Sequence, residues 1–124
     1  MRTPIAKHII NTLALLAAFA GSSVAFAHAH LKSAMPAQDS STPAPEVLTL
    51  EFTEGIEAKF SRVTLSHDGS AVELKGITTA AGNNKVLLVT PAKPLANGQY
   101  QVQWHVISVD THKSEGAYRF QVGN

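Results

Sequence analysis

The stretch QYQVQWHV, residues 99–106, alternates strictly between polar and apolar side chains. Successive side chains of an extended chain point to opposite faces, so the pattern predicts a strand with one buried and one exposed face. Its inward residues are Tyr100, Val102, Trp104 and Val106, and its outward residues are three glutamines and His105. Trp104, the one tryptophan of the chain, is therefore expected at the centre of the core.

Six further segments carry the same alternation or a short apolar run, at residues 31–35, 47–52, 63–65, 72–74, 86–89 and 118–122. Turn residues separate several of them. Asp68-Gly69 predicts a hairpin, because glycine tolerates the positive φ that such turns require. About seven strands without useful helical periodicity predict an all-β fold, a small antiparallel β-sandwich or barrel of the immunoglobulin-like kind with Greek-key connections.

Two of these segments carry more specific expectations. In the first, Leu31, Ser33 and Met35 are expected to share one face, with Met35 in the core. The run Val86–Val89 is apolar at every position and predicts a strand that is buried on both faces.

The N-terminal region has the features of a cleaved export signal. Arg2 and Lys7 precede an apolar run at residues 9–20, and Ala25-Phe26-Ala27 is an A-x-A cleavage site. The run is shorter than the ~20 residues that span a bilayer; an uncleaved membrane anchor is the alternative. We therefore expect residues 1–27 to be a signal peptide and residues 28–124 to be one domain that acts outside the cytoplasm without entering the membrane.

The composition excludes several kinds of function. The chain has no cysteine, which rules out thiolate catalysis, iron–sulfur clusters and cysteine zinc sites. Loss of residues 1–27 removes two of the ten basic residues and changes the formal net charge from +1 to −1. A near-neutral domain of mixed charges is not typical of proteins that bind nucleic acid or anionic membranes.

Asp110 and His112, in the stretch SVDTHKSEG at residues 108–116, are candidate metal ligands. Residues i and i+2 of an extended segment point the same way, so the carboxylate and the imidazole are able to converge on one ion. The alternative is a turn at the end of the strand, in which Asp110 accepts hydrogen bonds from backbone N–H groups and His112 is solvated.

A cut after Ala27 makes His28 the first residue of the mature protein. Its free α-amine and its imidazole then form a bidentate chelate, which no internal histidine offers. Ala27-His28-Ala29 is also an A-x-A site, and a cut after Ala29 leaves His30 first instead. We favour the earlier cut, because Phe26 fits between two alanines more easily than the polar His28 does.

Three stretches of the chain resemble the CopC/YobA family of periplasmic copper-binding proteins. They are HAHLKSAMPA at residues 28–37, LEFTEGIEAKFS at 50–61 and PAKPLANGQYQVQWHVISVDTHKSEGAYRFQV at 91–122. Their most specific motifs are the mature N-terminal histidine, Y-x-V-x-W and S-x-D-x-H. The resemblance covers residues 28–122 and implies a small cupredoxin-like β-barrel or sandwich in the periplasm that binds Cu(II) and is not an enzyme.

The resemblance also implies ligands and partners. Carried over by position, the Cu(II) ligands fall on His28, Asp110 and His112, and on Glu54 as in some family members. One Cu(II) per chain agrees with the donors, because nitrogen and oxygen without thiolate suit tetragonal Cu(II), which leads the Irving–Williams order. A CopD-type inner-membrane protein is the implied partner of a monomeric chain. Some members bind Cu(I) through a methionine-rich segment, whereas this mature chain contains Met35 alone.

The remaining histidines have other interpretations. On a flexible N-terminus, His30 at the third mature position is able to enclose Cu(II) together with the amine and two backbone amides. His67 is expected to be a solvated residue at a hairpin tip. His105 is expected on the outer face of its strand, either exposed or next to the metal ligands.

Three classes of function stay open at this point. The first is a Cu(II) carrier or buffer in copper homeostasis or resistance. The second is an enzyme like the copper monooxygenases that chelate copper with an N-terminal histidine, although this chain is much shorter and places a carboxylate where those enzymes leave copper open for oxygen. The third is a β-sandwich interaction domain in which the histidines are incidental.

Overall fold

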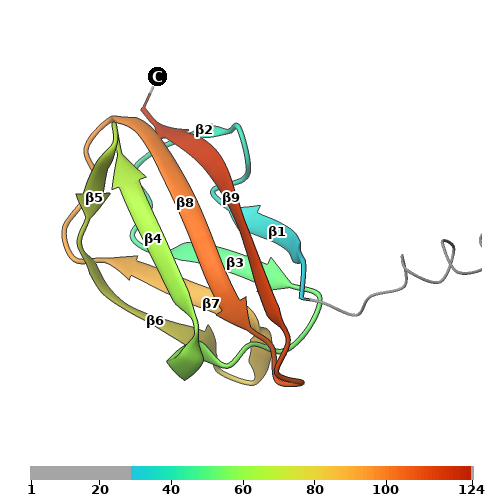
Figure 1. Cartoon of the computed structure of the whole chain (residues 1–124). Helices are drawn as coiled ribbons and strands as arrows, with labels where there is room; N and C mark the ends of the chain where they lie inside the picture. The colour runs from blue at the N-terminus through green and yellow to red at the C-terminus, as the bar shows by residue number, and fades with distance from the viewer. Residues whose placement is uncertain (1–28, 124) are drawn as a thin grey trace, which may run out of the picture.

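The computed structural model describes residues 29–123, which form two β-sheets packed face to face and one short 3-10 helix, η1, at Ala58–Phe60 (Figure 1). The four-stranded sheet has the order β1 (Leu31–Met35), β3 (Leu48–Phe52), β7 (Asn83–Pro91), β6 (Leu74–Ala80). The five-stranded sheet has the order β2 (Ser41–Thr42), β9 (Lys113–Val122), β8 (Gly98–Ile107), β4 (Arg62–His67), β5 (Ser70–Val72). Every paired strand is antiparallel to its neighbour except β2, which runs parallel to β9. The predicted all-β antiparallel sandwich is confirmed, and these two sheets do not close into a barrel.

The segment predicted as one strand at residues 72–74 is divided between the two sheets. Val72 ends β5 in the five-stranded sheet, and Leu74 begins β6 in the four-stranded sheet. β6 and the two-residue strand β2 raise the number of strands within residues 29–123 from the expected seven to nine. The hairpin at Asp68-Gly69 is confirmed, with φ of 50° and 85° at these two residues and β4 paired with β5.

The expected placement of Met35 in the core is wrong. The pairing of β1 with β3 shifts between Leu31 and Ser33, which marks a β-bulge. An extra residue in a bulge reverses the faces of the residues that follow it. Leu31 and Ala34 therefore pack against the core, and Met35 is 69% exposed.

The expectation that Val86–Val89 is buried on both faces is also wrong. Leu87 and Val89 are fully buried, whereas Val86 and Leu88 are only partly buried. A two-layer sandwich covers one face of each sheet, so the outer residues of β7 lack a third layer above them.

The core lies between the sheets and centres on the residues that the alternation of β8 predicts. Tyr100, Val102, Trp104 and Val106 are all buried. Trp104 meets Phe52 of the opposite sheet edge to face, with ring centroids 6.0 Å apart and an interplanar angle of 75°. Burial raises the pKa of Tyr118, which packs beside Trp104, to about 12.

Strands β8 and β9 form a continuous antiparallel ladder from the pair Gly98–Val122 to the pair Ile107–Lys113. The five residues that join the two strands, 108–112, contain the predicted metal-ligand motif. They lie at the lower right of Figure 1, where β8 ends and β9 begins. Both ends of this turn are thus held by the longest ladder of the described fold.

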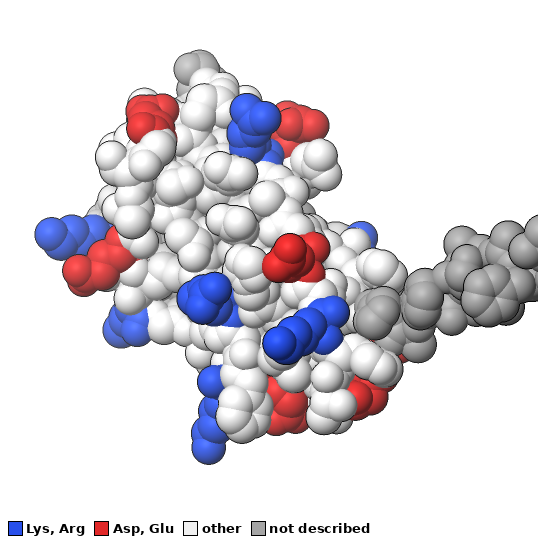
Figure 2. Space-filling model, viewed as in Figure 1, with Lys and Arg blue, Asp and Glu red and all other residues white. Residues whose placement is uncertain are grey.

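Charged side chains of both signs are interspersed on the face that Figure 2 shows. None of the helices within residues 29–123 has the length and apolar character needed to cross a membrane.

A substitution of Gly116, the β9 residue opposite Trp104, tests the packing of the core. A Cβ atom at this position would lie 2.3 Å from Cζ2 of the buried indole, so Gly116→Ala should destabilise the fold by about 1–3 kcal/mol. Gly76→Ala is the matched control, because a Cβ there meets no atom within 4 Å and should change stability by less than about 0.5 kcal/mol. Urea unfolding followed by Trp104 fluorescence measures both, and equal stabilities of the two variants would refute the packing argument.

Candidate metal centre

Residues 108–112 form a tight turn rather than the extended segment that the sequence suggested. The Ser108 N–H donates to the carbonyl of His112 at 2.9 Å, and the Thr111 N–H donates to the carbonyl of Ser108 at 2.8 Å. Thr111 has φ of 70°, in the left-handed region that a threonine rarely adopts. The chain therefore folds back on itself between β8 and β9. Asp110 and His112 do not share one face of an extended segment, as expected, but lie in a turn.

The turn nevertheless brings the two predicted ligands together. Asp110 Oδ2 and His112 Nδ1 are 3.1 Å apart. Two donors that bind one ion at right angles, each at ~2.0–2.2 Å, are themselves ~2.8–3.1 Å apart. The side chains of His112 and Asp110 are 52% and 44% exposed, so an ion can reach them from solvent. The turn and the solvent exposure of His112 agree with the alternative interpretation, and the predicted convergence of Asp110 and His112 is confirmed.

Ser108, the first residue of the turn, was not singled out as a functional residue. It is fully buried, and its hydroxyl donates to Asp110 Oδ1 and accepts from the His112 N–H at 3.2 Å. Position 108 continues the inward series of β8, so the alternation predicts burial there. A serine at a buried position needs a hydrogen-bond partner, and this is the signal that could have found it.

The hydrogen bond from the Ser108 hydroxyl is the main cause that holds the pKa of Asp110 below its ordinary value of 3.8. Desolvation opposes this effect, and the hydrogen bond and positive charge of His112 add to it. A carboxylate that stays ionised is available to a cation without first losing a proton.

The loop after β3 joins this turn to the N-terminal segment. On one side, the Val109 N–H donates to the carbonyl of Gly55 at 2.9 Å. On the other side, the Thr53 N–H donates to the carbonyl of His30 at 2.9 Å, and the His30 N–H donates to Thr53 Oγ1 at 2.9 Å. Glu54 lies between these two attachments and is partly buried.

The predicted ligands are not all assembled by the described part of the chain. His28 lies outside the described residues. Among residues 29–123, no three or more histidine, aspartate and glutamate side chains are grouped in a way that could hold a metal. Asp110 and His112 thus stand together as a pair, and Glu54 does not join them in such a group.

Two other described histidines, His67 and His105, lie apart from this pair in their contacts. The ring of His67 stacks on Tyr100 with centroids 4.5 Å apart and planes at 10°, and its side chain is only 27% exposed, so the expectation of a solvated turn residue is wrong. It ends β4 and packs on β8 because its strand is paired there. His105 Nδ1 lies 2.9 Å from Glu115 Oε2 on the outer face of the same sheet.

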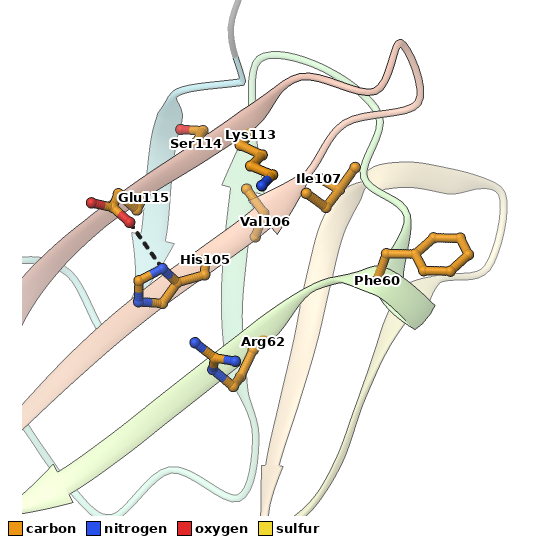
Figure 3. Close-up of a pocket in the computed structure, with 8 residues that line it drawn as sticks. All are labelled: Phe60, Arg62, His105, Val106, Ile107, Lys113, Ser114 and Glu115. Atoms are coloured by element: carbon orange, nitrogen blue, oxygen red, sulfur yellow. Dashed lines mark ion pairs between the residues drawn. The ribbon is translucent and has the colours of Figure 1, made fainter.

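A hollow of about 470 Å³ lies around this His105–Glu115 pair. Figure 3 shows the side chains that line it. Arg62 and Lys113 bring positive charges to it, and Phe60 adds an aromatic ring that is 71% exposed. Ile107 and Lys113, the residues that flank the 108–112 turn, line it as well. The hollow therefore adjoins the candidate metal centre without containing its two ligands.

Comparison with known proteins defines the class of protein to which this fold and site belong. The CopC domain model matches residues 31–123, so the chain belongs to the CopC family. It is 32% identical to Copper resistance protein C of Pseudomonas syringae pv. tomato, over 92% of this chain and 98% of the relative. It is 38% identical to Protein YobA of Escherichia coli strain K12, over 94% of this chain and 96% of the relative.

Solved structures agree with this assignment. The crystal structure of PcoC, described as a methionine-rich copper resistance protein from Escherichia coli, matches with a TM-score of 0.72 and 36% identity, covering 78% of this chain and all of PcoC. CopC from Methylosinus trichosporium OB3b matches with a TM-score of 0.71 and 30% identity, covering 77% of this chain and 93% of that protein. The family resemblance expected from the sequence is confirmed.

The lowered pKa of Asp110 predicts how the metal-free turn responds to acid. Because the folded protein binds this proton less tightly than the unfolded chain does, ionised Asp110 stabilises the fold above pH 3.8, and this contribution is lost as the pH falls through the lower folded-state pKa. Carboxyl ¹³C NMR of the metal-free protein should show Asp110 titrating below 3.8, and Ser108→Ala should raise the midpoint. A midpoint at or above 3.8 in the folded wild type would contradict this interpretation.

Proposed function

We propose that the mature protein binds Cu(II) in the periplasm and acts as a carrier or buffer in copper homeostasis or resistance. The observation that carries the proposal is the Asp110–His112 pair, with donor atoms 3.1 Å apart in an exposed turn of a CopC-family fold. Two relatives named for copper resistance match this chain over 98% and 96% of their own length, which supports the same role here.

We propose that His28 completes the site through its α-amine and its imidazole, for one Cu(II) per chain. Two described contacts support this arrangement. His30 is hydrogen-bonded to Thr53, and Gly55 is hydrogen-bonded to Val109. The loop that contains Thr53 and Gly55 therefore connects the segment at His30 to the turn that carries Asp110. Glu54 lies within that loop and is the candidate for an additional oxygen ligand.

The donor set favours Cu(II) over Cu(I). Imidazole, amine and carboxylate suit Cu(II), whereas Cu(I) is selected by soft sulfur ligands. PcoC is described as methionine rich, but this chain has two methionines, and Met35 is the one that remains in the proposed mature protein. An exposed, single thioether is a weak basis for a Cu(I) site.

The proposed cut after Ala27 agrees with the packing of Ala29. This residue is fully buried and belongs to the hydrophobic core, so a cut after Ala29 would remove a core residue. The backbone of His30 is also engaged on both its N–H and its carbonyl by Thr53. Binding of Cu(II) by the His30 amide would have to break the first of these bonds.

The proposed role is binding without turnover. A carboxylate next to His112 fills a coordination position that oxygen chemistry would need open, which favours a carrier over a monooxygenase. In this role a monomeric protein would exchange copper with a membrane partner of the CopD type.

The mature N-terminus is the first point to test. Intact-mass measurement of protein purified from the periplasm should give a chain that begins at His28. A chain that begins at His30 would remove the chelating residue and refute the proposed ligand set.

The second test adds one residue ahead of His28, which keeps the imidazole but moves the amine out of the chelate. Cu(II) affinity, measured by competition with a chelator, should fall by roughly 10²-fold or more, because the amine no longer binds within the same residue. His112→Ala should weaken binding comparably, and Asp110→Asn should weaken it less, since an amide oxygen still ligates. His105→Ala is the control, because this histidine pairs with Glu115 on the outer face and should leave the affinity unchanged.

The opposite pattern would identify a different site. If His30→Ala abolished binding while His112→Ala had no effect in folded protein, the ion would be held by the N-terminal amides and His30. If no variant changed the affinity, the histidines would be incidental and the domain would have another role.

A further inference from the structure

Ser108 is the buried polar residue at the base of the exposed turn, and its position is fixed by the fold. Its N–H donates to the His112 carbonyl at 2.9 Å, and it forms an isolated bridge with Ile56 across from the end of β8. Its side chain is inaccessible to solvent, whereas Asp110 and His112 are exposed. One immobile hydroxyl therefore lies beneath two exposed side chains.

The Ser108 hydroxyl forms a hydrogen bond with only one of the two carboxylate oxygens of Asp110. A hydroxyl has a single proton to donate, and its nearest acceptor is Oδ1 of Asp110, since the carbonyl of His112 lies farther away, at 3.3 Å. The other oxygen, Oδ2, faces His112 Nδ1 at 3.1 Å. The same hydroxyl accepts from the His112 N–H at 3.2 Å, so it contacts both predicted ligand residues.

We propose that Ser108 is a positioning residue of the copper site, which occupies Oδ1 of Asp110 so that the carboxylate offers Oδ2 alone to the metal. The inference rests on the proposed function, in which Asp110 and His112 bind Cu(II). Without the Ser108 hydroxyl, Oδ1 of the exposed carboxylate loses its donor, so that either oxygen, or both, can face the ion. With it, the carboxylate is a single-oxygen ligand oriented toward His112 before copper arrives.

Ser108 would act as hydrogen-bond partners of metal ligands generally do, by fixing the orientation of the ligating group. Partners that hold a ligating group in place typically change metal affinity by 10–100-fold when they are removed. A donor on the oxygen that does not bind metal also disfavours bidentate binding, because that oxygen is already engaged in a hydrogen bond. Ser108 acts through Asp110, so its effect should depend on the presence of the aspartate.

A double-mutant cycle with Cu(II) as the probe tests this dependence. Ser108→Ala should raise the dissociation constant for Cu(II) by about 10–100-fold in the wild-type background. In an Asp110→Ala background, the same substitution should change it by less than about threefold. The Cu(II) electron paramagnetic resonance spectrum should change in Ser108→Ala, because the coordination of the carboxylate oxygen changes, and should be insensitive to Ser108 once Asp110 is absent.

Ser61→Ala is the matched control. Its hydroxyl accepts from the Ile107 N–H at 3.0 Å and donates to the Glu57 carbonyl at 2.8 Å, so it holds the neighbouring loop without touching either ligand residue. This variant should lose stability comparable to that lost by Ser108→Ala but keep the wild-type Cu(II) affinity. Urea unfolding of the metal-free proteins measures the stability of both.

One measurement needs no variant. Three-bond couplings in the NMR spectrum of the metal-free wild type should show Asp110 in one χ1 rotamer. Rotamer averaging there would overturn the proposal, as would an equal effect of Ser108→Ala in both backgrounds. If Asp110→Ala left Cu(II) binding intact, the proposed ligand set would fail. If Asp110→Ala weakened binding but Ser108→Ala did not, the role of Ser108 alone would be refuted.

Discussion

The antiparallel ladder between β8 and β9 is the constraint on which both the core and the candidate site depend. It pairs Trp104 with Gly116, where the missing side chain leaves room for the indole. It also ends at the pair Ile107–Lys113, so both ends of the five-residue turn are fixed by backbone hydrogen bonds. The ladder thereby holds the two proposed ligand residues in place, although both are exposed and have little packing of their own.

The inward-facing residues of β8 and its continuation contribute both to the core and to the candidate site. From Tyr100 to Val106 this face supplies apolar side chains to the core, and at Ser108 it supplies a hydroxyl. Because that hydroxyl is buried, it must be bonded, and the groups within its reach are the carboxylate of Asp110 and the backbone of His112. The requirement to satisfy one buried polar atom therefore orders the turn that carries the two proposed ligands.

This chain and PcoC have a similar fold but differ in their methionine content. Both have the same sandwich, with a TM-score of 0.72, but PcoC is described as methionine rich. Here a bulge in β1 directs Met35 to solvent, away from the core that its spacing predicted. The described turn of this chain offers one nitrogen and one oxygen donor, on His112 and Asp110, and such donors fit the proposed Cu(II) chemistry.

The alternation of apolar residues by itself determined that the fold is all-β, either a sandwich or a barrel. It also determined the buried face of β8 and the position of Trp104, because burial on one face imposes a period of two. The D-x-H motif predicted that Asp110 and His112 converge, but through an extended segment and not through a turn. Only the tertiary structure decided the bulge that exposes Met35 and the division of residues 72–74 between two sheets, since both depend on which strands pair across the sandwich. It also decided that Asp110 and His112 meet through a turn held by Ser108, because a buried hydroxyl gains its partners only when the strands around it have closed.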